Sequence, residues 1–242
     1  MTYNVDLAHR QHPGLRPHSV ANPKQPRTES RAQTFRVERA RYAKAEDAYR
    51  IRLQKLVDDY LGRRIGAQEL VSTVRQDMYS FYARMYVLGR RAVGNVSTTL
   101  SREEQAWLHG QHSLDMKFFH KFLSDMGNQR GRMPYTQRMD LYGLGGYSAY
   151  LMGAIRSLPE WETQRWEWEV NPVAEHCEDC VQRGIESKRK GGFLGKELLV
   201  VGLPGMQKCG HRCRCGLRLV GGRRSLLRTR STQFAQIKGR IV

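Results

Sequence analysis

Hydrophobic residues recur at helical spacing through the first part of the chain. From about residue 33 to Leu61, and again from about Ala67 to Val93, they follow steps of three and four. Such spacing places apolar side chains on one face of a helix, and Gly62 and Gly94 are typical stops. Two amphipathic helices are therefore predicted. Their apolar stripes consist of Tyr42, Ala45, Tyr49, Leu53, Leu56 and Tyr60, and of Leu70, Val74, Met78, Phe81, Met85, Leu88 and Ala92.

Two more helical segments are predicted after Gly94. Ser101 and Glu104 form a capping box, in which hydroxyl and carboxylate each satisfy a backbone amide at the start of a third helix. A fourth helical stretch runs from Tyr135 to Ser157. It is interrupted by three glycines that do not form the G-x-G-x-x-G pattern of a dinucleotide site. We interpret them as positions of close helix packing or of a kink: Gly143, Gly145 and Gly146.

Further along the chain the hydrophobic period changes to two. Trp166, Trp168 and Val170 alternate with polar residues, which predicts a strand. Leu198–Val201 and Leu217–Val220 are predicted as a second and a third strand. The stretch from 184 to 192 is predicted as an exposed loop, which contains Lys188, Arg189 and Lys190.

These patterns divide the chain into four parts. Residues 1–31 contain four prolines and little to bury, so a disordered arm is expected. Residues 32–158 form a helical domain, 159–221 a β module and 222–242 a basic C-terminal tail. The predicted fold class is α+β, a mainly helical N-terminal part followed by a small antiparallel β module with a cysteine cluster. No run approaches the roughly 20 apolar residues of a membrane helix, so no membrane partner is expected.

The five cysteines fall in two tight groups, Cys177-Glu-Asp-Cys180 and Cys209-Gly-His-Arg-Cys213-Arg-Cys215. Two short turns that each contribute a pair of thiolates suit the tetrahedral preference of zinc. Disulfides would use four cysteines and leave one over, and residues 1–31 contain no apolar run typical of a secretory signal. We therefore expect a zinc site, with Cys177, Cys180, Cys209 and Cys213 as the first choice of ligands.

Two further residues compete for a place in this site. We expect a strand to turn Cys215 to the face opposite Cys213, which makes Cys215 a spare or substitute ligand. His211 is the other alternate, and His176 is expected to be an ordinary polar neighbour. A catalytic zinc keeps an open position beside a general base, and the chain has no H-E-x-x-H or H-x-E motif for one. A closed, structural site is therefore favoured.

The chain is strongly basic. Lysine and arginine number 41 against 23 acidic residues, a formal net charge of +18, and the excess is concentrated in tails and loops such as 212–240. This favours contact with a polyanion, most simply nucleic acid, over a surface that serves only solubility. No recognition-helix motif and no basic region leading into heptads is present, so sequence-specific reading of bases is not expected.

No catalytic constellation stands out in the sequence. Motifs for a serine or cysteine nucleophile and for a phosphate-binding loop are missing. A nuclease with a catalytic metal at Glu175, His176 or Asp179 is an alternative, but these residues suit an exposed turn equally well. Because no pair of nucleophile and general base can be assigned, we do not expect an enzyme.

The order of these features resembles the phage head morphogenesis family, also called the Mu F-like minor head proteins. The resemblance covers roughly residues 130–220, with 138–156 similar to the family's last helix before the strand. The family usually has a histidine shortly before its Cys-Arg-Cys segment. Here Cys209-Gly-His211-Arg stands at that place, which leaves the fourth ligand open between Cys209 and His211. The resemblance is carried by Trp166, Trp168, Cys177, Cys180, Pro204, Cys213, Arg214 and Cys215.

This resemblance implies a minor capsid protein of a tailed phage that acts in head assembly or in DNA packaging and delivery. The implied partners are the portal, the major capsid and scaffold proteins, and phage DNA contacted through basic tails and loops. The implied location is the virion, in the head interior or at the portal vertex, and the host cytoplasm during assembly. A zinc-ribbon nucleic-acid-binding protein unrelated to capsids is the alternative.

Overall fold

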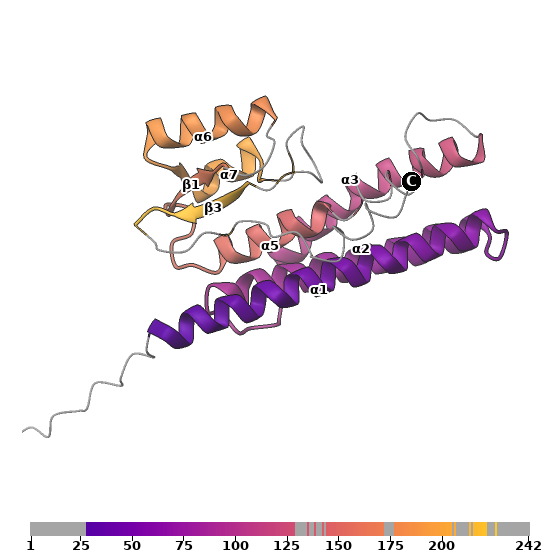
Figure 1. The fold of residues 1–242 in the computed structure, drawn as a ribbon, viewed down its shortest axis with the longest axis horizontal. Coiled ribbons are helices and arrows are strands. Elements are labelled where there is room, and N and C mark those ends of the chain that lie inside the picture. Colours follow the sequence, from indigo (N-terminus) through magenta and orange to yellow (C-terminus); the bar gives the residue numbers. More distant parts are fainter. Residues whose placement is uncertain are drawn as a thin grey trace, which may run out of the picture.

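The computed structural model describes residues 28–128, 135, 138, 142, 144–171, 177–204, 206, 213, 215–221 and 226, with side chains from residue 40 onward. Helices come first and a small sheet follows, which confirms the predicted α+β class (Figure 1). The elements are α1 (Thr28–Leu61), α2 (Ala67–Ala92), α3 (Arg102–Gly127), α5 (Leu144–Arg156), β1 (Arg165–Glu169), α6 (Glu178–Lys190), β2 (Phe193–Leu194), α7 (Gly195–Val201) and β3 (Gly216–Leu219).

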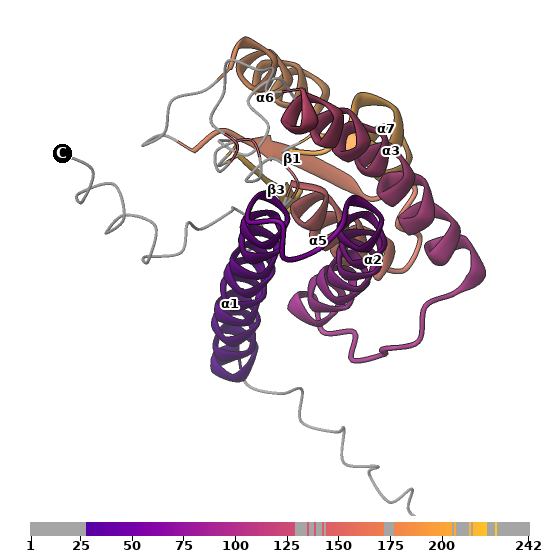
Figure 2. The same cartoon turned by 90° about the vertical axis from the view of Figure 1, so that its right-hand side faces the viewer.

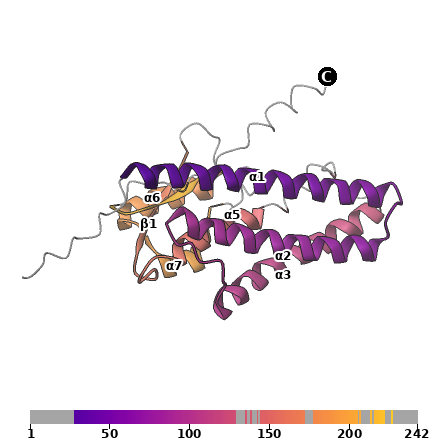
Figure 3. The same cartoon turned by 90° about the horizontal axis from the view of Figure 1, so that it is seen from below.

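Helix α2 is the centre of the helical domain. It runs back along α1 and also contacts α3 and α5 (Figures 1 and 3). The predicted apolar stripe of α2 is buried along its whole length, and that of α1 is buried as far as Leu53. The capping box of Ser101 and Glu104 is present at the start of α3. The two amphipathic helices therefore form as the hydrophobic spacing predicts. None of the described helices is long and apolar enough to cross a membrane.

Helices α2 and α5 cross at glycines. A Cβ added to Gly89 would lie 1.9 Å from the carbonyl oxygen of Tyr150, and one added to Gly153 would lie 2.0 Å from the carbonyl oxygen of Tyr86. The two backbones therefore approach as closely as they do only because these positions lack a side chain. Gly145 and Gly146 likewise pack on rings of α2, which confirms close packing as their role. Gly143 lies outside the described residues.

The sheet has the order β2-β1-β3, and both pairings are antiparallel. It lies between α6 and α5, as two perpendicular views show (Figures 1 and 2). Trp166 and Trp168 of β1 are fully buried, and the backbone amide of Trp168 donates a hydrogen bond of 2.8 Å to Ser187 Oγ of α6. On the face of the sheet opposite the two tryptophans, Arg218 of β3 forms ion pairs with Glu167 and Glu169.

The predicted loop at 184–192 is wrong, because α6 occupies most of it. Two acidic residues in the first turn and three basic ones in the last suit the helix dipole, and Gly191 ends the helix with a positive φ of 66°. Gly184 lies inside the helix, where a Cβ would come 2.8 Å from Val170 Cγ2. This glycine marks close packing on the residue after β1, not a loop.

The predicted strand at Leu198–Val201 is also wrong, since this segment belongs to α7. Its helical start is secured by Glu197, whose Oε2 accepts a hydrogen bond of 2.7 Å from the amide of Leu194. A short apolar run fits a strand and a buried helical turn equally well by its pattern. The third strand of the sheet comes instead from Phe193 and Leu194.

Two described segments lie across the predicted boundaries. Helix α1 begins at Thr28, inside the expected arm of 1–31, and residues 1–27 lie outside the described part of the chain. Leu226 falls in the expected tail of 222–242, yet it is 3% exposed and its amide donates a hydrogen bond of 2.7 Å to Leu217 O. Leu226 is therefore packed against β3.

Candidate metal centre

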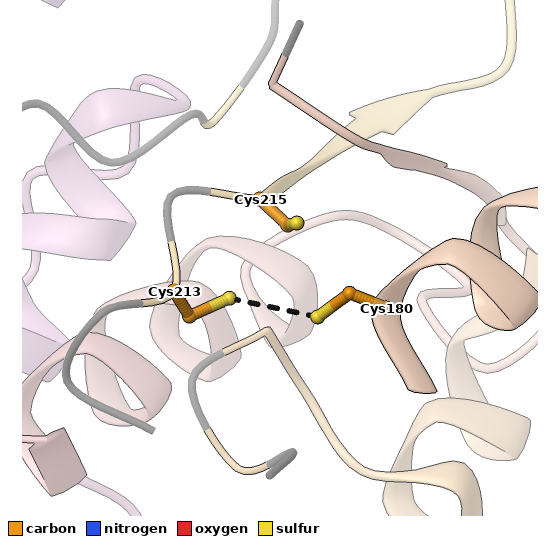
Figure 4. Close-up of side chains that lie close together, drawn as sticks. All are labelled: Cys180, Cys213 and Cys215. Carbon is orange, nitrogen blue, oxygen red and sulfur yellow. Dashed lines mark hydrogen bonds between the residues drawn. The ribbon is translucent and has the colours of Figure 1, made fainter. Parts of the chain in front are cut away.

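Three cysteine sulfur atoms meet in the β module. The Sγ atoms of Cys180, Cys213 and Cys215 all lie within 4.8 Å of one another, and all three residues are buried (Figure 4). The Sγ atoms of Cys180 and Cys213 are 3.9 Å apart, well beyond the roughly 2 Å of a disulfide bond. Thiolate is a soft donor that suits zinc and similar ions. This buried group can hold a metal ion.

Two elements bring the sulfurs together. Cys180 lies in the first turn of α6, three residues after the N-cap residue Cys177, and Cys213 and Cys215 lead into β3. Strands β3 and β1 are paired, and α6 packs on β1. The group is therefore held where the start of a helix meets the start of a strand.

The helical domain also reaches this centre, through Tyr147 of α5. Its hydroxyl lies 2.8 Å from the carbonyl oxygen of Cys215 and 2.8 Å from that of Leu226. The ring of Tyr147 is buried and meets that of Tyr42 on α1 edge-on, with 6.0 Å between the ring centres. Tyr147 therefore fixes the backbone of one cysteine from the other domain. Nothing in the sequence signalled this role.

The predicted ligands have different outcomes. The structure brings Cys180 and Cys213 together, as predicted. Cys177 is half-buried at the N-cap of α6 and does not belong to the group found among the described residues. Cys209 and His211 lie outside the described residues, as do His176 and Glu175. Asp179 lies in the first turn of α6.

The expectation that Cys215 turns away from Cys213 is wrong. Their side chains point into the same group (Figure 4). In an extended chain successive side chains alternate, so residues two apart face the same side. The Cys-Arg-Cys spacing was therefore a signal for two neighbouring sulfurs, and Cys215 has as strong a position in the group as Cys213.

The thiols influence one another's protonation. A hydrogen bond with Cys180 lowers the pKa of Cys215, but a hydrogen bond with Cys213, burial and the charge of Cys213 outweigh it and raise the pKa to about 11. Several thiolates side by side in a buried place need a cation to balance them. A metal ion that displaces the thiol protons supplies that charge.

Comparison with known proteins gives no match to a family model, to a curated protein or to a solved structure. The function must therefore be argued from the residues and their geometry.

Proposed function

We propose that the cysteine group is a structural zinc site. Cys180, Cys213 and Cys215 would supply three thiolates, and Cys177, Cys209 or His211 the fourth ligand. Zinc prefers such sulfur and nitrogen donors in tetrahedral arrangement, and binding would add directly to the folding free energy of the small β module. The buried position of all three sulfurs supports a closed site over a catalytic one.

We further propose that the protein is a minor head morphogenesis protein of a tailed phage, associated with the portal and with DNA during head assembly, packaging or delivery. The observation that carries this proposal is that the motifs of the family resemblance lie together in the β module. The W-x-W strand β1 pairs with β3, and the C-x2-C and Cys-Arg-Cys segments each contribute to the sulfur group. We infer that the protein acts in assembly and binding and not as an enzyme, because no pair of nucleophile and general base can be assigned in its sequence.

The distribution of charge supports the DNA contact. No aspartate or glutamate follows Glu197, so the last part of the chain is uniformly basic. Such a segment suits phosphates of any sequence, whose neutralisation releases counterions and makes binding depend steeply on salt. Its lysines and arginines, apart from Arg218 which pairs with Glu167 and Glu169, are Lys208, Arg212, Arg214, Arg223, Arg224, Arg228, Arg230, Lys238 and Arg240.

The head assignment is tested by quantitative mass spectrometry of purified procapsids and heads from the source system. A low, fixed ratio of this protein to the portal is the expected result. Its absence from particles at every assembly stage would remove the assignment. Salt-dependent DNA binding without any capsid partner would then favour the alternative, a zinc-ribbon nucleic-acid-binding protein unrelated to capsids.

The zinc site is tested separately by elemental analysis and by hydrogen exchange. We expect about one zinc per chain in the purified protein, and loss of both metal and β-module protection in Cys180→Ser, while α1 and α2 stay protected. Cys215→Ser should behave in the same way. Cys177→Ser, outside the sulfur group, is the comparison that shows whether this residue is the fourth ligand. Full protection of the module in metal-free Cys180→Ser would contradict a structural site.

A further inference from the structure

Asp115 is a carboxyl group held between three helices. It belongs to α3, and its Oδ2 accepts a hydrogen bond from the hydroxyl of Tyr82 on α2. Gly145 of α5 comes so close that a Cβ there would lie 2.2 Å from Tyr82 Oη and 2.6 Å from Asp115 Oδ2. Helix α5 therefore rests directly on this pair, and only a residue without a side chain fits at the contact.

The surroundings disfavour the charged form of Asp115. Burial raises the pKa of Asp115 to about 6, although the hydrogen bond from Tyr82 acts in the opposite direction. Among the described residues, Arg138 pairs with Asp125 and Arg52 with Asp77, and neither pair includes Asp115. An ionised Asp115 is thus held by one hydrogen bond in a poorly solvated place. Among the described residues, the charge of Asp115 acts on Tyr49 of α1, Tyr82 of α2 and Tyr142 before α5. The charged groups linked to these tyrosines are Asp77 with its partner Arg52, Asp125 and Arg138.

The contact at Gly145 is linked to the cysteine group by a short path. Tyr147 follows two residues later on the same helix, and its hydroxyl contacts the carbonyl oxygens of Cys215 and Leu226. A helix moves as a rigid unit over so short a distance. Any change in how α5 sits on Asp115 therefore reaches the backbone that positions Cys215.

We propose that Asp115 is a protonation-dependent clamp on α5. The neutral carboxyl holds α5 against α2 and α3, and ionisation loosens α5 and, through Tyr147, the backbone of the cysteine group. The raised pKa sets the direction of the pH dependence, because the folded state binds the proton more tightly than the open state does. The clamp is therefore strongest at low pH and weakens as pH rises through about 6. The clamp depends on neither zinc nor a phage role.

The test is hydrogen exchange on the full-length protein at pH 5 and pH 8, corrected for the intrinsic pH dependence of exchange. Ionisation of Asp115 should raise the equilibrium constant for local opening of Leu144–Arg156 roughly tenfold from pH 5 to pH 8. Gly216–Leu219 of β3 should lose protection in parallel. Asp115→Asn, which keeps an acceptor for Tyr82 but cannot ionise, should lack this tenfold component in both segments. Histidines such as His112 contribute equally to the pH dependence of the variant and of the unaltered protein, so the difference between the two isolates the contribution of Asp115.

Glu103→Gln is the matched control, because it removes an exposed carboxylate from the same helix and should keep the pH dependence of the unaltered protein. Tyr82→Phe gives a second, independent variant. It removes the hydrogen bond that favours the ionised carboxyl, so the loss of protection at pH 8 should be larger than in the unaltered protein. An equal pH dependence in Asp115→Asn and the unaltered protein would overturn the clamp, and a change in α5 without one in β3 would overturn the link to the cysteine group.

Discussion

At the scale of single residues, Glu104 is a buried carboxylate with several partners in the helical domain. Its carboxylate pairs with Arg90 and accepts hydrogen bonds from the hydroxyl of Tyr86 at 3.0 Å and from the amide of Ser101 at 2.7 Å. Arg90 in turn donates to the carbonyl oxygen of Thr99 at 2.7 Å. One carboxylate thus secures the start of α3, the end of α2 and the segment between them.

We expect Glu104→Gln to lower the free energy of unfolding by roughly 3 kcal/mol near pH 7, because it leaves the buried Arg90 without its charge partner. Urea denaturation measures this directly. Glu103→Gln, on the same turn but exposed, should change stability by less than about 0.5 kcal/mol. Similar losses of unfolding free energy in the two variants would show that the buried ion pair of Arg90 and Glu104 stabilises the protein no more than an exposed carboxylate at the helix start does.

The same variant has a predictable pH dependence. Burial raises the pKa of Glu104, but hydrogen bonds from Arg90, Ser101 and Tyr86 outweigh it and hold the pKa below its usual value. A depressed pKa gives stability that is present above the pKa of the unfolded chain and lost as pH falls through the folded value. The stability gap between the unaltered protein and Glu104→Gln should therefore narrow below about pH 4.5. A gap that is constant down to pH 3 would contradict this account.

At the scale of elements, the crossing of α2 and α5 depends on Gly89 and Gly153. Gly89→Ala should lower the free energy of unfolding by at least about 2 kcal/mol, since the new methyl group would meet the carbonyl oxygen of Tyr150 and drive the helices apart. Gly110 of α3 offers the matched control, because nothing lies within 4 Å of a Cβ placed there. Gly110→Ala should raise stability by roughly 0.5–1 kcal/mol through helix propensity alone. Thermal unfolding of the two variants should shift in opposite directions.

The elements that the sequence predicted well are those with clear periodic patterns. Helices α1 and α2 carry many apolar residues at one spacing, and β1 alternates two tryptophans with charged residues. Each of these patterns fits only one type of secondary structure. The errors fall on segments with few apolar residues or with a short apolar run. In α6, Gly184 resembles a loop residue until its contact with Val170 is known, and the apolar run of α7 is too short to show a period. Tertiary packing decides such segments, and a single sequence does not show it.

The cysteine group was predictable only in part, for the same reason. The spacing of Cys180 and Cys213 identified two members, and a correct count along an extended chain would have added Cys215. Tyr147 could not have been found, because its partner carbonyl oxygen lies 68 residues further along the chain. A tyrosine in an apolar helix gives no sign of such a distant contact. The parts of a site that come from separate domains are the parts that sequence patterns miss.

At the scale of the whole molecule, Tyr147 is a residue through which the helical domain forms hydrogen bonds with the β module. Tyr147→Phe keeps the buried ring and removes the hydroxyl, which leaves the carbonyl oxygens of Cys215 and Leu226 without that donor. Removing a donor from a buried acceptor costs about 1–3 kcal/mol, and here the cost falls on the module, because both acceptors belong to it. We expect Gly216–Leu219 to exchange amide hydrogens roughly tenfold faster or more, while α1 and α2 exchange as before.

Tyr60→Phe provides the comparison, since Tyr60 is a half-buried tyrosine at the far end of α1 and its hydroxyl should not affect β3. If Tyr147→Phe accelerates exchange in β3 alone, the two domains are separately cooperative and joined by a specific contact. Acceleration of α1, α2 and β3 by the same factor would instead mean that the chain opens as one unit. In that case the sulfur group is held by the stability of the whole molecule, and the hydroxyl of Tyr147 has no special role in positioning Cys215.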